Sequence, residues 1–205
     1  ISDYYGVDPR YGTLGDFVEF THGCKQRGIR VIIDLVVNHT SDQHDWFKQA
    51  RADKASRYRD WYVWSDKKPA NADQGMVFPG VQKSTWTRDK VSRAYYFHRF
   101  YDFQPDLNTA NPFVQEEILK IMGFWIQLGV CGFRMDAVPF VIATKGPEVK
   151  KPAEQFDMLA NDQQVGERVI DNGDFHDDVS HVAGSRSTAR AAISVSISSA
   201  AAFCN

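Results

Sequence analysis

Cysteine is scarce in this chain, and long apolar runs are missing. Only Cys24, Cys131 and Cys204 are present, an odd number at wide spacing. This pattern gives no zinc-binding spacing and favours free thiols, as in a reducing compartment, so we expect a cytoplasmic protein. No apolar stretch approaches the ~20 residues that span a bilayer, so a membrane protein is not predicted.

The chain also lacks an excess of positive charge. Lysine and arginine number 24 against 26 acidic residues, which gives a net charge of −2 and a pI near 6.3. No basic patch indicates nucleic-acid binding, and no glycine-rich phosphate loop indicates a nucleotide, so we expect no organic cofactor. The first residue, Ile1, carries no signal-peptide pattern and falls inside a motif described below. We therefore expect that the natural start of the protein lies upstream, and a signal peptide there is an open alternative to the cytoplasmic location.

Apolar periodicity predicts alternating helices and parallel strands. Thr13 is a suitable cap for a helix to about Arg27, with a buried face at Leu14, Phe17, Val18 and Thr21. Residues 29–37 are almost continuously apolar, as in a strand that is covered on both sides. Asn111 and Pro112 are a good start for a second helix that ends at Gly129, and residues 132–138 form the next strand. The order predicts β/α architecture.

Residues 40–105 interrupt this alternation and hold 14 of the 27 aromatic residues. A connection longer than ~15 residues usually carries function or forms a small domain. Its aromatic rings offer surfaces on which sugars stack, and Trp61, Tyr62 and Trp64 are candidates for the roof of a pocket. The alternative is that these rings form the core of the insert.

Two short segments carry the chemistry. Residues 132–138 read Gly-Phe-Arg-Met-Asp-Ala-Val and place Arg134 and Asp136 on one strand face. A permanent cation beside Asp136 is expected to lower the pKa of this carboxyl group and keep it ionised, as a nucleophile requires. Residues 34–40 read Asp-Leu-Val-Val-Asn-His-Thr and bring Asp34, Asn38 and His39 to the end of the other strand.

These segments resemble two signature regions of the alpha-amylase family, glycoside hydrolase family 13. Residues 3–13, 58–64 and 104–108 resemble three further stretches of the family in the same order. The combination is most similar to the branch that holds trehalose synthase and oligo-1,6-glucosidase. The similarity covers about residues 1–159.

The resemblance implies an α/β fold, namely part of a (β/α)8 TIM barrel around its strands 3 and 4 with an inserted B domain. The implied parts are residues 1–39 (barrel), 40–110 (B domain), 111–159 (barrel) and 160–205 (irregular tail).

The resemblance also implies roles for single residues. Asp136 is the nucleophile, Arg134 orients it, and His39 binds the hydroxyls of the transferred sugar. Asp34 supports the Arg134–Asp136 pair, and Tyr5 stacks under the reactive sugar. A structural carboxylate at Asp136, a strand-end histidine at His39 and a packing role for Tyr5 are the alternatives.

A metal site is implied at Asn38 and Asp106, because many family members bind calcium where the B domain meets the barrel. Oxygen ligands of this kind suit a hard cation. The alternative is that both residues form turns.

No acid/base carboxyl group is found in the sequence. Glu154, Glu167 and Asp178 lie near the expected position, but none follows an apolar strand. Serine and alanine supply 11 of the last 20 residues. A shifted reading frame after about Leu159 and a divergent native tail are equal alternatives for this region.

The sequence thus predicts a fragment of a retaining enzyme that acts on maltose, trehalose or other α-glucosides, inactive by itself. The first hypothesis is trehalose synthase, which interconverts maltose and trehalose through a glucosyl-enzyme on Asp136. An α-glucosidase or α-amylase is the alternative within the class. A non-catalytic carbohydrate-binding relic is the alternative outside it.

Overall fold

The computed structural model describes residues 1–141 and Lys145. The chain groups into two compact units. We call the part that holds Tyr4–Leu35 and Gln115–Asp136 the strand unit. The part that holds Ile1–Asp3, Val36–Val114 and, after Asp136, the described residues 137–141 and Lys145 is called the insert unit.

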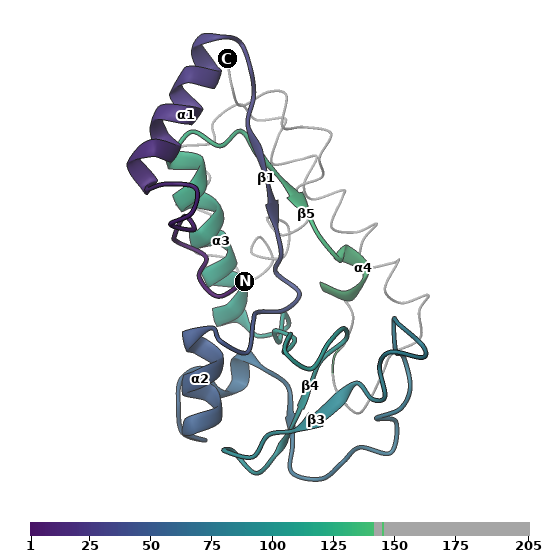
Figure 1. Ribbon diagram of the computed structural model, residues 1–205. Coiled ribbons are helices and arrows are strands. Elements are labelled where there is room, and N and C mark those ends of the chain that lie inside the picture. The colour runs from purple at the N-terminus through teal and green to yellow at the C-terminus, as the bar shows by residue number, and fades with distance from the viewer. Residues whose placement is uncertain (142–144, 146–205) are drawn as a thin grey trace. The chain divides into compact units, whose positions relative to one another are not determined.

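The strand unit is built on two parallel strands. Strand β1 (Ile32–Leu35) pairs with β5 (Gly132–Met135) in a register that sets Asp34 opposite Arg134. Helices α1 (Leu14–Gln26) and α3 (Pro112–Gln127) lie on the same side of this pair (Figure 1). The predicted α/β architecture is confirmed, although the two strands form no closed barrel among the described residues.

Helix α1 starts and ends as the sequence predicts. The Thr13 hydroxyl accepts a hydrogen bond from the Asp16 amide (3.2 Å), and the Asp16 carboxylate accepts one from the Thr13 amide (2.7 Å). This capping box satisfies two amides at the helix start. The predicted buried face is confirmed at Thr21, which is 4% exposed, but it is wrong at Leu14 and Val18, which are 36% and 41% exposed. The helix meets α3 through Phe17 and Thr21, so only that side is covered.

Both predicted strands are shorter in the structure. Strand β1 covers Ile32–Leu35 instead of 29–37, and Ile32 is 52% exposed rather than covered on both sides. Among the described residues β1 pairs with β5 alone, so its other edge has no partner strand there. Strand β5 stops at Met135, because Ala137 adopts a left-handed φ of 56° and helix α4 (Val138–Val141) follows.

Helix α3 agrees closely with its pattern. The Asn111 side chain accepts a hydrogen bond from the Phe113 amide at 2.9 Å, as expected of a helix cap. The predicted face is buried at all five positions, namely Val114, Ile118, Ile121, Met122 and Trp125. The helix ends before Gly129, whose φ of 94° suits glycine.

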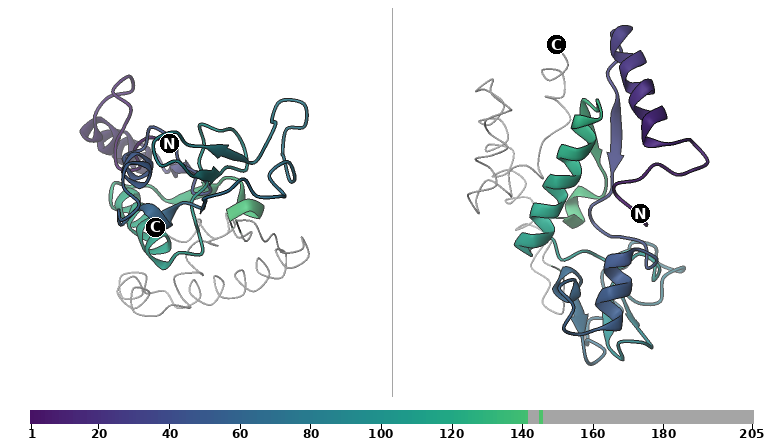
Figure 2. Two further views of the ribbon diagram at one scale, coloured as in Figure 1. Left: turned by 90° about the horizontal axis from the view of Figure 1, so that it is seen from below. Right: turned by 90° about the vertical axis from the view of Figure 1, so that its left-hand side faces the viewer.

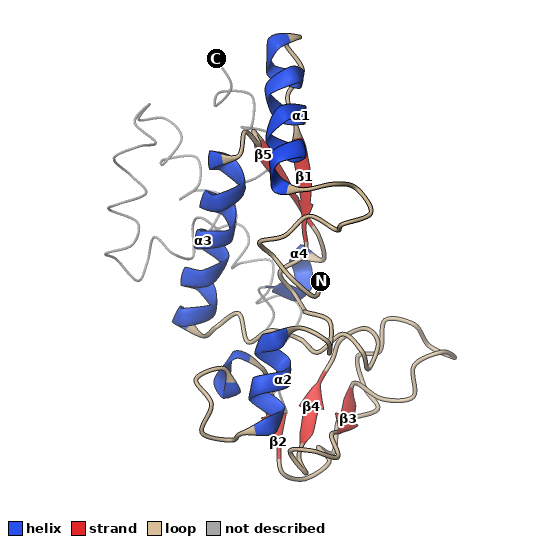
Figure 3. Ribbon diagram, turned by 60° about the vertical axis from the view of Figure 1, so that its left-hand side comes forward, coloured by secondary structure: helices blue, strands red, loops and turns tan. Residues whose placement is uncertain are grey.

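The insert unit packs short elements around aromatic side chains. It contains α2 (Asp45–Ala52), the 3-10 turn η1 (Arg59–Trp61), β2 (Trp64–Ser65), β3 (Trp86–Arg88) and β4 (Tyr95–Phe97). The strands form an antiparallel sheet in the order β2-β4-β3 (Figure 3). Figure 2 draws the same elements in blue and teal from two further sides. On α2, Phe47 is buried and contacts the rings of Tyr62, Trp64 and Tyr96.

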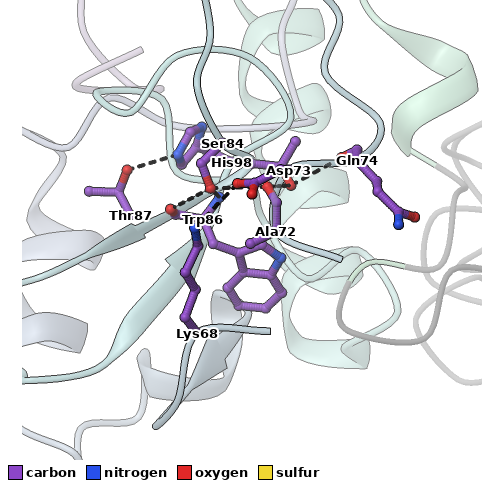
Figure 4. Close-up of polar contacts among 9 residues, drawn as sticks. Lys68, Ala72, Asp73, Gln74, Ser84, Trp86, Thr87 and His98 are labelled. Carbon is purple, nitrogen blue, oxygen red and sulfur yellow. Dashed lines mark hydrogen bonds and ion pairs between the residues drawn. The ribbon is translucent and has the colours of Figure 1, made fainter. Parts of the chain in front are cut away.

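Polar contacts hold the long loop between β2 and β3. The Ala72 carbonyl accepts hydrogen bonds from the Thr85 amide (2.7 Å) and the Ser84 hydroxyl (3.0 Å). Beside them His98 shares a 3.0 Å hydrogen bond with Thr87 (Figure 4). Burial lowers the pKa of His98, which favours the neutral ring in this position. The loop is therefore fixed on the sheet mainly by main-chain acceptors.

Cys24 is a free thiol, as predicted. Cys131 is disulfide-bonded, so the expectation of free thiols throughout is wrong, and the cysteines do not indicate a compartment. Among the described residues, no helix combines the length and the apolar character that crossing a bilayer requires.

Candidate active site

Arg134 joins two carboxylates at the C-terminal ends of β1 and β5. Its Nη1 atom donates to Asp34 Oδ1 at 3.0 Å, and its Nη2 atom lies 3.7 Å from Asp136 Oδ1. The parallel register brings Asp34 opposite Arg134, and the Asp136 amide donates to the Leu35 carbonyl at 3.1 Å. The structure therefore brings three predicted site residues together.

A permanent positive charge lies beside the two carboxylates of this group. The hydrogen bond to Asp34 and the charges of both carboxylates raise the pKa of Arg134, so the guanidinium is a fixed positive charge. The Asp136 side chain is 42% exposed and is open to a ligand. A half-exposed carboxylate held beside a permanent cation is suited to attack an electrophilic carbon.

Tyr5 belongs to the same unit, but it contacts helix α3. Its hydroxyl donates to Glu117 Oε1 at 2.9 Å, and its ring makes an edge contact with Phe124 at 5.2 Å between centroids. Burial and Glu117 raise the pKa of Tyr5. These contacts are those of the packing alternative, and stacking under a sugar stays a prediction.

His39 lies in the insert unit and is 7% exposed. Its two ring nitrogens face side-chain amides, with Asn38 Nδ2 at 3.3 Å from Nδ1 and Gln104 Nε2 at 3.2 Å from Nε2. The Phe100 ring makes an edge contact with the imidazole at 5.2 Å. Gln104 was not predicted as a site residue, and its only signal in the sequence is its place at the start of the 104–108 motif.

Asn38 and Asp106 meet in the interior of the insert unit, where both are 0% exposed. Asn38 Nδ2 donates to Asp106 Oδ2 at 3.2 Å. The ammonium group of Lys145 donates to Asn38 Oδ1 (2.8 Å) and the Asn38 carbonyl (3.0 Å) and lies 3.2 Å from Asp106 Oδ2.

This arrangement does not fit a calcium ion. The oxygens that would bind calcium already accept hydrogen bonds from a buried cation, and Asn38 turns its amide nitrogen toward the carboxylate. The described residues also contain no cluster of three or more His, Cys, Asp or Glu side chains that suits a metal. Lys145 was not predicted, because nothing in its local sequence marks a buried lysine.

The aromatic residues proposed as a roof lie within the insert unit. Trp61 and Tyr62 are 8% and 2% exposed. The Trp64 ring stacks on Phe47 with 5.6 Å between centroids, and the Arg59 guanidinium lies 3.7 Å from its centre. The core interpretation is therefore confirmed for these residues, and a roof at Trp64 is not supported.

Two predictions are not decided by this geometry. His39 lies in one unit and Asp136 in the other, so their convergence stays a prediction. The acid/base candidates Glu154, Glu167 and Asp178 lie outside the described residues, as does the tail beyond about Leu159.

Comparisons with known proteins agree with the resemblance seen in the sequence. Residues 1–194 match the family described as alpha amylase, catalytic domain. A trehalose synthase/amylase of Mycolicibacterium smegmatis is 48% identical over 159 residues, which cover 78% of this chain and 27% of that protein. An oligo-1,6-glucosidase of Bacillus cereus is 39% identical over 161 residues, covering 76% of this chain and 28% of that protein.

Solved structures show the same likeness. The trehalose-6-phosphate hydrolase of Bacillus licheniformis aligns with a TM-score of 0.64 and 41% identity over 70% of this chain and 26% of that one. The trehalulose synthase of Pseudomonas mesoacidophila aligns with a TM-score of 0.60 and 42% identity, covering 68% of this chain and 25% of that one. The chain spans about a quarter of the length of these proteins.

Proposed function

Because this chain belongs to the alpha-amylase family, we propose that it carries the nucleophile of an enzyme that cleaves or transfers α-glucosidic bonds. The observation that carries the proposal is the Arg134 bridge between Asp34 and Asp136 at the ends of two parallel strands. Polar groups at this end of the strands are where β/α barrels hold their catalytic residues.

The proposed reaction proceeds with retention of configuration. Asp136 attacks the anomeric carbon of an α-glucoside, the glucosidic bond breaks, and the leaving oxygen takes a proton from a second carboxylic acid. Retaining enzymes place the two carboxyl groups ~5–5.5 Å apart. Arg134 places a positive charge beside Asp136 and orients it, while Asp34 holds the guanidinium in place.

The most specific form of the proposal is a trehalose synthase, which interconverts maltose and trehalose. In that reaction the released glucose stays bound, turns, and attacks the glucosyl-enzyme through another hydroxyl. Support comes from the relative in Mycolicibacterium smegmatis and from a trehalose synthase of Pimelobacter that is 45% identical over 159 residues.

Hydrolysis is the second candidate function. Water then takes the place of the released glucose, and free glucose is the product. The similarity to oligo-1,6-glucosidase and to trehalose-6-phosphate hydrolase favours this candidate. A carbohydrate-binding relic would keep His39 and bind maltose without turnover.

Products formed from maltose by the full-length protein that contains this chain separate these candidates. We expect trehalose as the main product with little glucose, and loss of both products in Asp136→Asn. Glucose alone indicates the hydrolase. Maltose binding without any product indicates the relic and contradicts the proposal.

A further inference from the structure

A cavity of about 550 Å³ opens beside the 3-10 turn η1 and the segment that leads into α3. We call it the η1 cavity. Its volume lies in the range of small-molecule sites, about 300–1,000 Å³. The lining belongs to the insert unit and includes Arg57, Asp60, Asn108, Asn111, Pro112 and Phe113. None of these residues belongs to the Arg134 group or to the surroundings of His39 described above.

Hydrogen bonds to the backbone of η1 fix the shape of the cavity. The side-chain amides of Asn108 and Asn111 both donate to the Asp60 carbonyl, at 3.1 Å and 3.0 Å. The main-chain amide of Asn108 donates to the carbonyl of Trp61 at 2.7 Å, and Trp61 is 8% exposed. These bonds join segments that lie 48 residues apart in the sequence. The cavity is therefore preorganised, which lowers the entropy that a ligand loses on binding.

Three groups of different chemistry surround this fixed frame. Asp60 is exposed, and its carboxylate makes no hydrogen bond or ion pair with the described residues. The Arg57 guanidinium lies over the Tyr58 ring at 4.6 Å and donates to the Tyr58 hydroxyl, which orients its other N–H groups. The Phe113 ring is 66% exposed, while its amide donates to Asn111 Oδ1 at 2.9 Å. A fixed backbone thus presents an acceptor, a donor and an apolar ring.

We propose that the η1 cavity binds a sugar ring of an α-glucan at a site that shares no residue with the Arg134 group. Arg57 and Asp60 carry opposite charges, so the lining has no net charge that would select a phosphate or a nucleotide. Carboxylate, carboxamide and guanidinium groups all pair with hydroxyls. The exposed ring of Phe113 suits the apolar C–H face of a pyranose.

A protein partner fits the η1 cavity less well. Stable protein interfaces bury about 800 Å² on each partner around an apolar centre. The cavity instead has one exposed aromatic ring among charged and amide groups. The choice of an α-glucan as the ligand rests on the proposed function. The site itself goes beyond that function, because it would hold a glucan without taking part in the cleavage of the glucosidic bond.

Native gel electrophoresis of the full-length protein that contains this chain, with and without glycogen in the gel, tests this inference. Phe113→Ala is expected to raise the apparent Kd for glycogen about five- to tenfold, as expected for the loss of one aromatic contact. Phe113→Tyr keeps the ring and should bind like the wild type. Asp60→Asn keeps the carbonyl that Asn108 and Asn111 bind but loses the charge, and it should weaken binding on the order of threefold.

The matched control is Phe103→Ala, because Phe103 is another exposed phenylalanine of the insert unit, at 53%, and does not line the cavity. It should leave the affinity for glycogen unchanged. Maltose turnover should stay within about twofold of the wild type in Phe113→Ala and Asp60→Asn. Their thermal unfolding midpoints should match that of the wild type, since both side chains are exposed.

A wild type that glycogen does not retard, or a Phe113→Ala variant with full affinity, would overturn the inference. Loss of maltose turnover together with glycogen binding in Phe113→Ala, at an unchanged unfolding midpoint, would make the cavity part of the catalytic pocket and would overturn it as well. A wild type that binds glycogen through Phe113 but does not turn over maltose would support the cavity and contradict the proposed function instead.

Discussion

Single residues decide the proposed chemistry, and Arg134 is the most informative of them. It uses two different nitrogens for two carboxylates, Nη1 for Asp34 and Nη2 for Asp136. Lysine offers one ammonium group at the end of a flexible chain and does not reproduce this fork. Arg134 therefore supplies both a positive charge and a fixed orientation. Substitution by lysine keeps the charge and removes the orientation.

We expect Arg134→Lys in the full-length protein to lower turnover of maltose on the order of 10²-fold, because Asp136 keeps a positive neighbour but loses its fixed orientation. Steady-state rates of product formation measure the effect. Arg10→Lys is the matched control, since Arg10 also pairs with an aspartate, Asp8, but on an exposed loop. Equal rates for Arg134→Lys and the wild type would contradict the assigned role.

His44 makes stability depend on pH. It caps α2 by accepting from the Trp46 amide at 3.1 Å, and burial is the main cause that lowers its pKa from 6.5 to about 4. Between these values the unfolded chain takes up a proton that the folded chain does not. The free energy of unfolding should therefore fall as the pH drops from 6.5 to about 4, by at most about 3 kcal/mol from this group.

Urea unfolding followed by tryptophan fluorescence measures this dependence. His44→Asn keeps an oxygen that caps the helix but does not titrate, so its unfolding free energy should fall less over this range. His22→Asn, at an exposed histidine of α1, should behave like the wild type. A wild type and a His44→Asn variant with parallel pH profiles would show that His44 does not contribute.

At the scale of elements, the contact of α1 with α3 depends on a glycine. Gly129 has a φ of 94°, and an added Cβ would lie 2.7 Å from the Thr21 hydroxyl, which donates to the Leu128 carbonyl. Gly129→Ala is expected to lower the unfolding free energy by about 1–3 kcal/mol. Gly123→Ala, in the middle of α3 with open space around it, should raise it by about 0.5–1 kcal/mol. Thermal unfolding followed by circular dichroism compares the two, and a similar effect of both would refute the explanation.

The ammonium group of Lys145 lies in the interior of the insert unit, beside Asn38 and Asp106. Burial lowers the pKa of Lys145, although Asp106 opposes this shift. Lys145→Met leaves the Asp106 carboxylate buried without its cation, which typically costs about 3–5 kcal/mol. Lys120→Met, at an exposed lysine that pairs with Glu116, should change stability by less than about 1 kcal/mol.

Thermal unfolding followed by circular dichroism measures the effect of Lys145→Met, and it also tests whether calcium stabilises the protein. Because Lys145 occupies the oxygens of Asn38 and Asp106, neither added calcium nor a chelator should move the unfolding midpoint of the wild type. A midpoint that falls with the chelator and recovers with calcium would show that a metal ion stabilises the native protein.

Local patterns predicted the elements whose contacts are local. The Thr13 cap, the Asn111 cap and the buried face of α3 follow from short-range rules, and the structure has them all. The lengths of β1 and β5 and the exposure of Leu14 depend on which neighbours cover them, and no periodicity in the sequence contains this information.

In the candidate site, too, the sequence predicted the residues in local motifs and not those that depend on distant contacts. Arg134, Asp136 and Asp34 stand in motifs that mark the ends of strands, so their meeting was predictable. Lys145 was not predicted, because its partners are far away in the sequence. Lys145 meets Asn38 across more than a hundred residues.

At the scale of the whole molecule, the chain holds two compact units and about a quarter of the length of its relatives. A retaining mechanism needs an acid/base group, and general acid catalysis contributes ~10²–10⁴-fold. We therefore predict that the 205-residue chain alone turns over maltose at a negligible rate. Purified chain that releases glucose or trehalose at about 10 s⁻¹, an ordinary enzyme rate, would contradict this prediction.

The central claim is that Asp136 is the nucleophile, and covalent trapping tests it most directly. The full-length protein is incubated with 5-fluoro-α-D-glucosyl fluoride, whose fluoride leaves readily while the ring fluorine slows hydrolysis of the glucosyl-enzyme. Peptide mapping by mass spectrometry then locates the bound sugar. We predict an adduct on Asp136 that is absent in Asp136→Asn. An adduct on another carboxylate, or turnover without any adduct on Asp136, would contradict the account.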